Sequence, residues 1–280
     1  MSKISSRRCS ALVGKLIKNE LKAGLHSIAP IYIVTAAVVA MLAVSFAFEI
    51  LWLAVISIIA VALVGIGIFA VTIISVVNNF NKSMFRDQGY LTFTLPVTSG
   101  QLLFAKALCS FIWMLLSYVA LIGIFAGIYA YAAGQVDDEQ FAMIKILIST
   151  MVELPDTATI IGVISFFVTY FFLDIIFLVA EIYFSVSLSN VRPFQKMGMG
   201  SAILIFLSLF SVTSVISTLL KAFVPLTLKI DFNGMTLIYE TMNEASGITF
   251  GIADMFFTLA ATVFFFVMSA WLMNHKINLK

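Results

Sequence analysis

Two carboxylates, Asp174 and Glu181, lie inside a long apolar run and are candidates for binding a proton, an ion or a substrate. Asp174 and Glu181 are seven residues apart, about two turns of a helix, so their side chains lie near one helical face. An ionised carboxylate is costly among apolar groups in a bilayer and often marks a substrate or ion pathway. The alternative is structural, with Asp174 hydrogen-bonded to a Ser, Thr or Tyr of a neighbouring helix and Glu181 near the membrane boundary. No basic partner is evident at the depth of Asp174.

The other reactive residue types do not form a recognisable catalytic or ligand pattern. The two histidines, His26 and His275, are far apart in the sequence, and Cys9 and Cys109 have no metal-ligand spacing. Zinc-protease, Cys-x-x-Cys, nucleophile-elbow and phosphate-loop motifs are missing from the sequence. We therefore expect no enzyme activity, metal or cofactor, and any ATP hydrolysis would belong to a partner chain.

The composition shows what kind of elements must position the two acids. Hydrophobic residues make up 62% of the 280 and charged residues 11%, whereas a soluble domain is roughly half apolar and a quarter charged. Several uncharged apolar runs are long enough to cross a bilayer, which takes about 20 residues. Such runs must be helical, because lipid cannot hydrogen-bond the backbone. The sequence predicts an all-α integral membrane protein with no nucleic-acid partner.

Six spans are predicted, and their boundaries follow the apolar runs. They cover about 30–48, 51–77, 102–132, 159–188, 199–220 and 252–273. We treat 1–280 as one transmembrane domain with spans 1–3 in 30–133, spans 4–5 in 159–222 and span 6 in 251–274. The connections are an inner loop at 78–101, outer loops at 134–158 and 223–250, and a tail at 275–280. The 226–239 segment favours a short hairpin around Asn233-Gly234 or, alternatively, two short interfacial helices.

The distribution of basic residues predicts the orientation. All but three of the 16 Lys and Arg residues fall on the side that holds both termini, the exceptions being Lys145, Lys221 and Lys229. Basic loops stay in the cytoplasm, so both termini are predicted to be cytoplasmic. Residues 1–29 have apolar and basic positions at helical spacing, which predicts an amphipathic helix on the inner membrane surface. Gly24 and Pro30 would let the chain turn from that surface into the first span.

One cytoplasmic stretch resembles a known family. It runs Phe-Arg-Asp-Gln-Gly-Tyr-Leu-Thr-Phe-Thr-Leu-Pro-Val from 85 to 97 and is followed by Gln101-Leu102-Leu103 and Lys106. This run is similar to the cytoplasmic loop of bacterial ATP-binding-cassette (ABC) type-two exporter permeases. The rest of the chain matches that family in hydropathy and layout only.

The resemblance implies a bacterial cytoplasmic-membrane protein that works with cytosolic ABC ATPase subunits. It also implies a second permease subunit, identical or diverged, with lipid around both. The inner loop would couple ATPase closure to the helices, through Arg86, Asp87, Gly89, Tyr90, Phe93 and Pro96. Arg192 in the next inner loop would make a smaller contact. The substrate is unknown.

Two other functions remain open from the residues alone. A secondary transporter would use Asp174 or Glu181 as a proton or ion site and need no ATPase. A non-transporting assembly or sensor protein would use the inner loops to bind a partner. Gly123 and Gly127 also form a Gly-x-x-x-Gly pair, a spacing that lets membrane helices approach closely.

Overall fold

The structure is a six-helix membrane protein with a small sheet at one end. The computed structural model describes residues 2–48, 50–85, 99–132, 157–191, 194, 199–231, 234–240 and 248–275. The helices are α1 (Ser2–Ala47), α2 (Leu51–Phe85), α4 (Ser99–Ala132), α6 (Thr157–Ser189), α7 (Met199–Phe223) and α8 (Ile252–His275). Each of the six is long and apolar enough to cross a membrane, so the predicted number of spans is confirmed. The side that each end faces stays a prediction.

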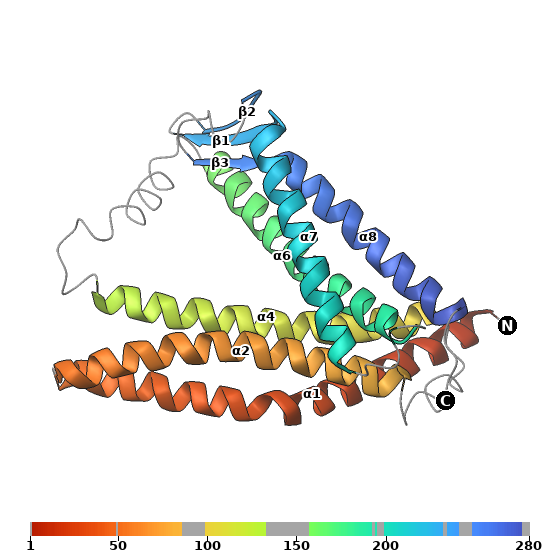
Figure 1. The fold of residues 1–280 in the computed structure, drawn as a ribbon, viewed down its shortest axis with the longest axis horizontal. Helices are drawn as coiled ribbons and strands as arrows, with labels where there is room; N and C mark the ends of the chain where they lie inside the picture. The colour runs from red at the N-terminus through yellow and green to blue at the C-terminus, as the bar shows by residue number, and fades with distance from the viewer. Residues whose placement is uncertain are drawn as a thin grey trace.

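The six helices form two groups of three. Helices α1, α2 and α4 pack together, and so do α6, α7 and α8 (Figure 1). The groups meet at the end that carries both termini and diverge toward the other end (Figure 1). At about 1.5 Å per residue, α2 and α4 are each roughly 50 Å long, well beyond a hydrocarbon core of about 30 Å. They must therefore tilt in the bilayer or project from it.

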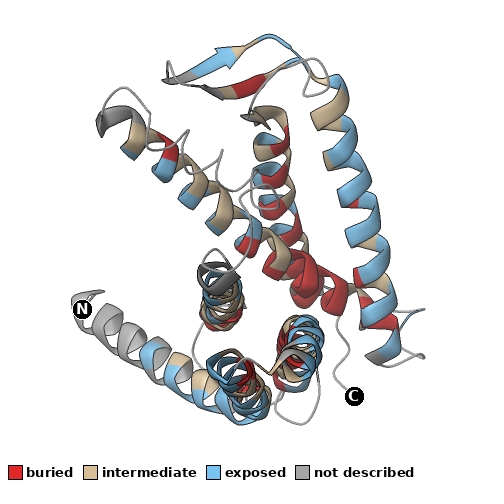
Figure 2. Cartoon of the chain, turned by 90° about the vertical axis from the view of Figure 1, so that its left-hand side faces the viewer, coloured by how far each residue is buried: buried red, intermediate tan, exposed pale blue. Residues whose placement is uncertain are grey.

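Helix α6 joins the two groups, because its C-terminal half packs against both. Tyr183 on α6 is 1% exposed and stacks on Phe80 of α2 with ring centroids 4.0 Å apart. The Tyr183 hydroxyl and Ser110 Oγ of α4 are 2.7 Å apart and share a hydrogen bond. On its other side, Phe184 stacks on Phe265 of α8 at 5.1 Å. Buried residues gather where the groups meet, and exposed residues cover most of the other helix surface (Figure 2).

A buried ion pair holds the first group together. Lys106 Nζ of α4 contacts Glu20 Oε1 of α1, with side chains 3% and 12% exposed. The second Glu20 oxygen accepts a hydrogen bond of 2.9 Å from Asn79 Nδ2, and Lys106 also lies 2.7 Å from Ser83 Oγ of α2. Because each charge has several polar partners, the cost of removing it from water is offset. One acid thus links α1, α2 and α4.

Helix α1 differs from the prediction of a surface helix followed by a separate span. The helix runs unbroken from Ser2 to Ala47 and includes Gly24 and Pro30. The first coloured part of α1 nevertheless runs across the view in Figure 2, whereas the later part of the helix is seen end-on. Pro30 has no N–H to donate within the helix, which is a common cause of such bends. The predicted turn is therefore a change of direction within one helix, and the interfacial location of residues 1–29 stays a prediction.

The fold class is not purely α, because a three-stranded sheet covers the end of the second group. The strands β1 (Thr227–Asp231), β2 (Gly234–Ile238) and β3 (Ile248–Gly251) are antiparallel in the order β2-β1-β3. The β1–β2 pair confirms the predicted hairpin, although its register closes at Asp231 and Gly234, one residue earlier than an Asn233-Gly234 turn. The outer loop at 134–156 lies outside the described residues.

Large apolar side chains cover much of the outer surface. Ile33, Ile66 and Phe125 are more than 60% exposed, a pattern that suits contact with lipid rather than water. Gly123 and Gly127 are exposed too, and no described atom outside the local backbone lies within 4 Å of a Cβ built on either. Within the part of the chain that the structure describes, the Gly-x-x-x-Gly pair is therefore not a helix-packing contact.

Gly24 of α1 lies against the Trp113 side chain of α4 and has no room for a side chain of its own. It is buried, and a Cβ placed there would collide with the Trp113 indole nitrogen. We expect Gly24→Ala to lower the thermal unfolding temperature in detergent, since overpacking costs about 1–3 kcal/mol. Gly123→Ala is the matched control and should not lower it, because alanine favours a helix by up to about 1 kcal/mol and space is free there.

A smaller ring opposite Gly24 should restore stability. Trp113→Phe in the Gly24→Ala background removes the indole nitrogen, which is the atom that the new methyl group would meet at the shortest distance. A Gly24→Ala variant as stable as the wild type, or a double variant with no recovery of stability, would contradict the close contact between Gly24 of α1 and Trp113 of α4.

Candidate functional site

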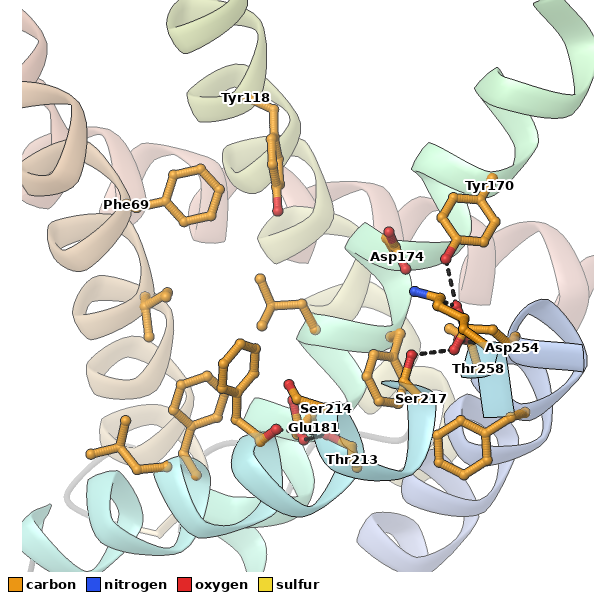
Figure 3. A pocket seen from close by; sticks show the side chains of 18 residues that line it. Phe69, Tyr118, Tyr170, Asp174, Glu181, Thr213, Ser214, Ser217, Asp254 and Thr258 are labelled. Atoms are coloured by element: carbon orange, nitrogen blue, oxygen red, sulfur yellow. Dashed lines mark hydrogen bonds and ion pairs between the residues drawn. The ribbon is translucent and has the colours of Figure 1, made fainter. Parts of the chain in front are cut away.

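A cavity of about 460 Å³ lies between the two helix groups. Its walls come from α2, α4, α6, α7 and α8, so no single element forms it. Polar side chains face it from the second group, whereas aromatic and aliphatic side chains line much of the rest (Figure 3). Its volume is in the range of cavities that hold small molecules in proteins.

Asp254 is the centre of a polar cluster at one end of the cavity. The residue is 1% exposed. Its Oδ2 accepts a hydrogen bond of 2.6 Å from the Tyr170 hydroxyl of α6 and lies 3.0 Å from Lys221 Nζ of α7. Its Oδ1 accepts a hydrogen bond from Ser217 Oγ of α7 (Figure 3). Three helices thus converge on one buried carboxylate.

The helix dipoles of α7 and α8 favour the charges of Lys221 and Asp254. Asp254 is in the first turn of α8, and Lys221 is in the last turn of α7. A helix N-terminus favours a negative charge and a C-terminus a positive one. The backbone N–H of Ile252 donates to the Leu226 carbonyl at 3.1 Å, which ties the start of α8 to the segment between α7 and β1. This bond therefore joins the start of α8, which carries Asp254, to the chain that follows Lys221 and α7.

Glu181 lies deeper in the second group and is fully buried. Its Oε1 accepts a hydrogen bond of 2.9 Å from Thr213 Oγ1 of α7 (Figure 3). Its Oε2 has no hydrogen-bond partner among the described residues. An unpartnered carboxylate oxygen in an apolar interior is costly and needs an explanation.

Asp174 and Glu181 line the same cavity, as their spacing on one face of a helix predicts. Lys221 lines the same cavity as Asp174, but its ion pair is with Asp254, and no described basic residue forms an ion pair with Asp174. Lys221 lies inside α7, which extends to Phe223, three residues beyond the predicted span. Asp174 is exposed, so the cavity is open at that residue.

The charge distribution in the sequence predicts Lys221 on the outer side but does not connect it with Asp254, which lies at the start of the predicted sixth span. The sequence feature that could have suggested this pairing was a charged residue at each of two helix ends. Tyr170, Ser217 and Thr213 carried none, since such residues are common in membrane helices and only their partners make them informative.

The predicted coupling residues lie outside the described part of the chain. These are Arg86, Asp87, Gly89, Tyr90, Phe93, Pro96 and Arg192. The helix ends that flank both predicted inner loops are described, namely the end of α2, the start of α4, the end of α6 and the start of α7. All four lie at the end of the molecule that carries the termini (Figure 1).

The chain was compared with protein-family models, curated proteins and solved structures, and none of the three comparisons found a match. The site must therefore be judged on its own geometry. It offers charged and apolar groups at the wall of an open cavity, an arrangement suited to binding a ligand.

Lys221 balances the charge of Asp254, so substitution of Lys221 should destabilise the group α6, α7 and α8. We expect Lys221→Met to lower the unfolding temperature, with a loss of about 1–3 kcal/mol for a buried charged group left short of a partner. The Lys221→Met/Asp254→Asn double variant should recover most of that loss, since it removes both charges. Additive losses in a double-mutant cycle would contradict the pairing.

Proposed function

We propose that this chain is the membrane-spanning permease subunit of an ATP-driven ABC transporter that acts as an exporter. A separate cytosolic ATPase would bind and hydrolyse ATP, and a second permease subunit would complete the translocation unit. The bacterial cytoplasmic membrane, with both termini inside, is the proposed location.

The observation that carries this proposal is the cavity between two divergent helix groups. A transporter needs a binding site between elements that can move relative to each other. The groups α1-α2-α4 and α6-α7-α8 meet at one end only, and the cavity wall is shared by both. A change in the angle between them would alter access to Asp174 and Glu181 without breaking either group.

The helix ends that flank residues 86–98 support coupling to an ATPase. Residues 86–98 link the end of α2 to the start of α4, and α6 contacts both of these helices. A force applied to this loop would act on the ends of α2 and α4. Those ends carry Phe80 and Lys106, which belong to the buried contacts of the junction and of the first group.

Purification from the native membrane tests the proposal. A tagged wild-type chain should bring down a phosphate-loop ATPase that mass spectrometry can identify. An Arg86→Ala/Asp87→Ala/Tyr90→Ala variant should retain a tenth of it or less. The matched control is Tyr239→Ala/Glu240→Ala, at two exposed positions directly after β2, which should retain the ATPase fully. A folded wild-type chain with no ATPase would refute the permease assignment.

A secondary transporter is the second candidate, and one observation favours it. Asp174 and Glu181 are the carboxylates first identified in the sequence, and both line the open cavity. In that case Asp174→Asn should abolish substrate flux driven by an ion gradient in proteoliposomes that contain this chain alone. Flux that appears only with an ATPase and ATP would eliminate this candidate.

A further inference from the structure

The cavity has an excess of negative groups. Asp174, Glu181 and Asp254 line it, and Lys221 is the one cation among its described lining residues. Lys221 is within 3.0 Å of Asp254, so that pair is matched. We propose that the cavity binds an amphiphilic organic cation, with Glu181 as the main anchor for its positive charge and Asp174 at the entrance. This inference rests on the proposed transport function and names the substrate class of the same site.

Glu181 provides the first argument, because its environment is incomplete without a ligand. Its side chain is 0% exposed, and Thr213 serves only one of its two carboxylate oxygens. A carboxylate buried in a membrane protein is expected to have a partner of opposite charge or a set of donors. No described Lys, Arg or His makes an ion pair with it. A ligand ammonium would supply both the positive charge and an N–H donor to Oε2.

The apolar wall provides the second argument. Aromatic rings line the cavity from both helix groups: Phe69, Tyr118, Phe177, Phe206, Phe210 and Phe257. The faces of such rings attract cations, by about 0.5–2 kcal/mol for each favourable contact. They also cover an apolar body, so one cavity can hold both parts of an amphiphilic cation.

The geometry favours an organic cation over a metal ion or an anion. The cavity volume of about 460 Å³ fits a molecule of drug size. Among the described residues, no three acidic, His or Cys side chains are grouped so that they could hold a metal ion. Seven residues separate Asp174 from Glu181, about 10 Å along a helix, too far to share one ion. An anion would meet three carboxylates and a single ammonium that is already paired.

Two dyes of similar ring system and opposite charge test the proposal. Rhodamine 6G is a cationic xanthene with N–H donors, and fluorescein is an anionic one. Fluorescence anisotropy with the full chain in phosphatidylcholine nanodiscs, corrected with empty nanodiscs, should show saturable binding of rhodamine 6G and at least tenfold weaker binding of fluorescein.

Variants then locate the charge. Glu181→Gln should weaken rhodamine 6G binding at least tenfold, and Asp174→Asn should weaken it several-fold. Asp174 is exposed, so its substitution should not impair folding. The matched control Glu240→Gln, at an exposed position that follows β2, should bind like the wild type. Equal affinity for the two dyes, or wild-type affinity in both carboxylate variants, would overturn the proposal.

The ligand's source and the proposed function are tested separately. If added phosphatidylethanolamine displaces rhodamine 6G from the wild type but not from empty nanodiscs, the cation is a lipid ammonium. If it does not, the cation is a free amphiphile, and both results keep the cation site. An ATPase partner without dye discrimination would overturn only the cation site. Dye discrimination without an ATPase partner would overturn only the ABC permease assignment.

Discussion

The structure depends on one constraint, which is that a polar group inside a bilayer has to find its partner within the protein. The backbone meets it by forming helices, and the charged side chains meet it by contacts between helices. Glu20 and Lys106 do so among α1, α2 and α4, and Asp254 and Lys221 do so between α8 and α7. Each helix group therefore has its own ion pair, and neither pair bridges the groups.

The contact between the groups has a different chemistry. The contact between the groups consists mainly of apolar and aromatic packing around α6. Tyr183 stacks on Phe80 and shares a hydrogen bond with Ser110. Close packing resists small deformations but can be rearranged without leaving a charge unpaired. Two groups with internal ion pairs and an apolar junction are suited to moving as units. The cavity has walls from both groups, so such a movement would change its shape.

Glu181 stands apart from the other buried acids. Glu20 and Asp254 each have a cation and at least one further donor, whereas Glu181 has Thr213 alone within the described residues. An unsatisfied buried group lowers stability, and such costs are often found at functional positions. Asp174 and Asp254 also differ in exposure. Asp174 is exposed, whereas Asp254 is buried among its partners.

The membrane class, the six helices and the shared face of Asp174 and Glu181 could be predicted from the amino-acid sequence, because these features follow from hydropathy and helical period alone. The sequence also indicated the hairpin of β1 and β2, since turn residues act locally. Strand β3, the continuity of α1 through Pro30, and the meeting of Lys221 with Asp254 were decided by the tertiary structure. Thirty-three residues separate Lys221 from Asp254 in the chain. Local patterns do not reveal which helix ends pack together, so only the folded arrangement could show that these charges share a cavity.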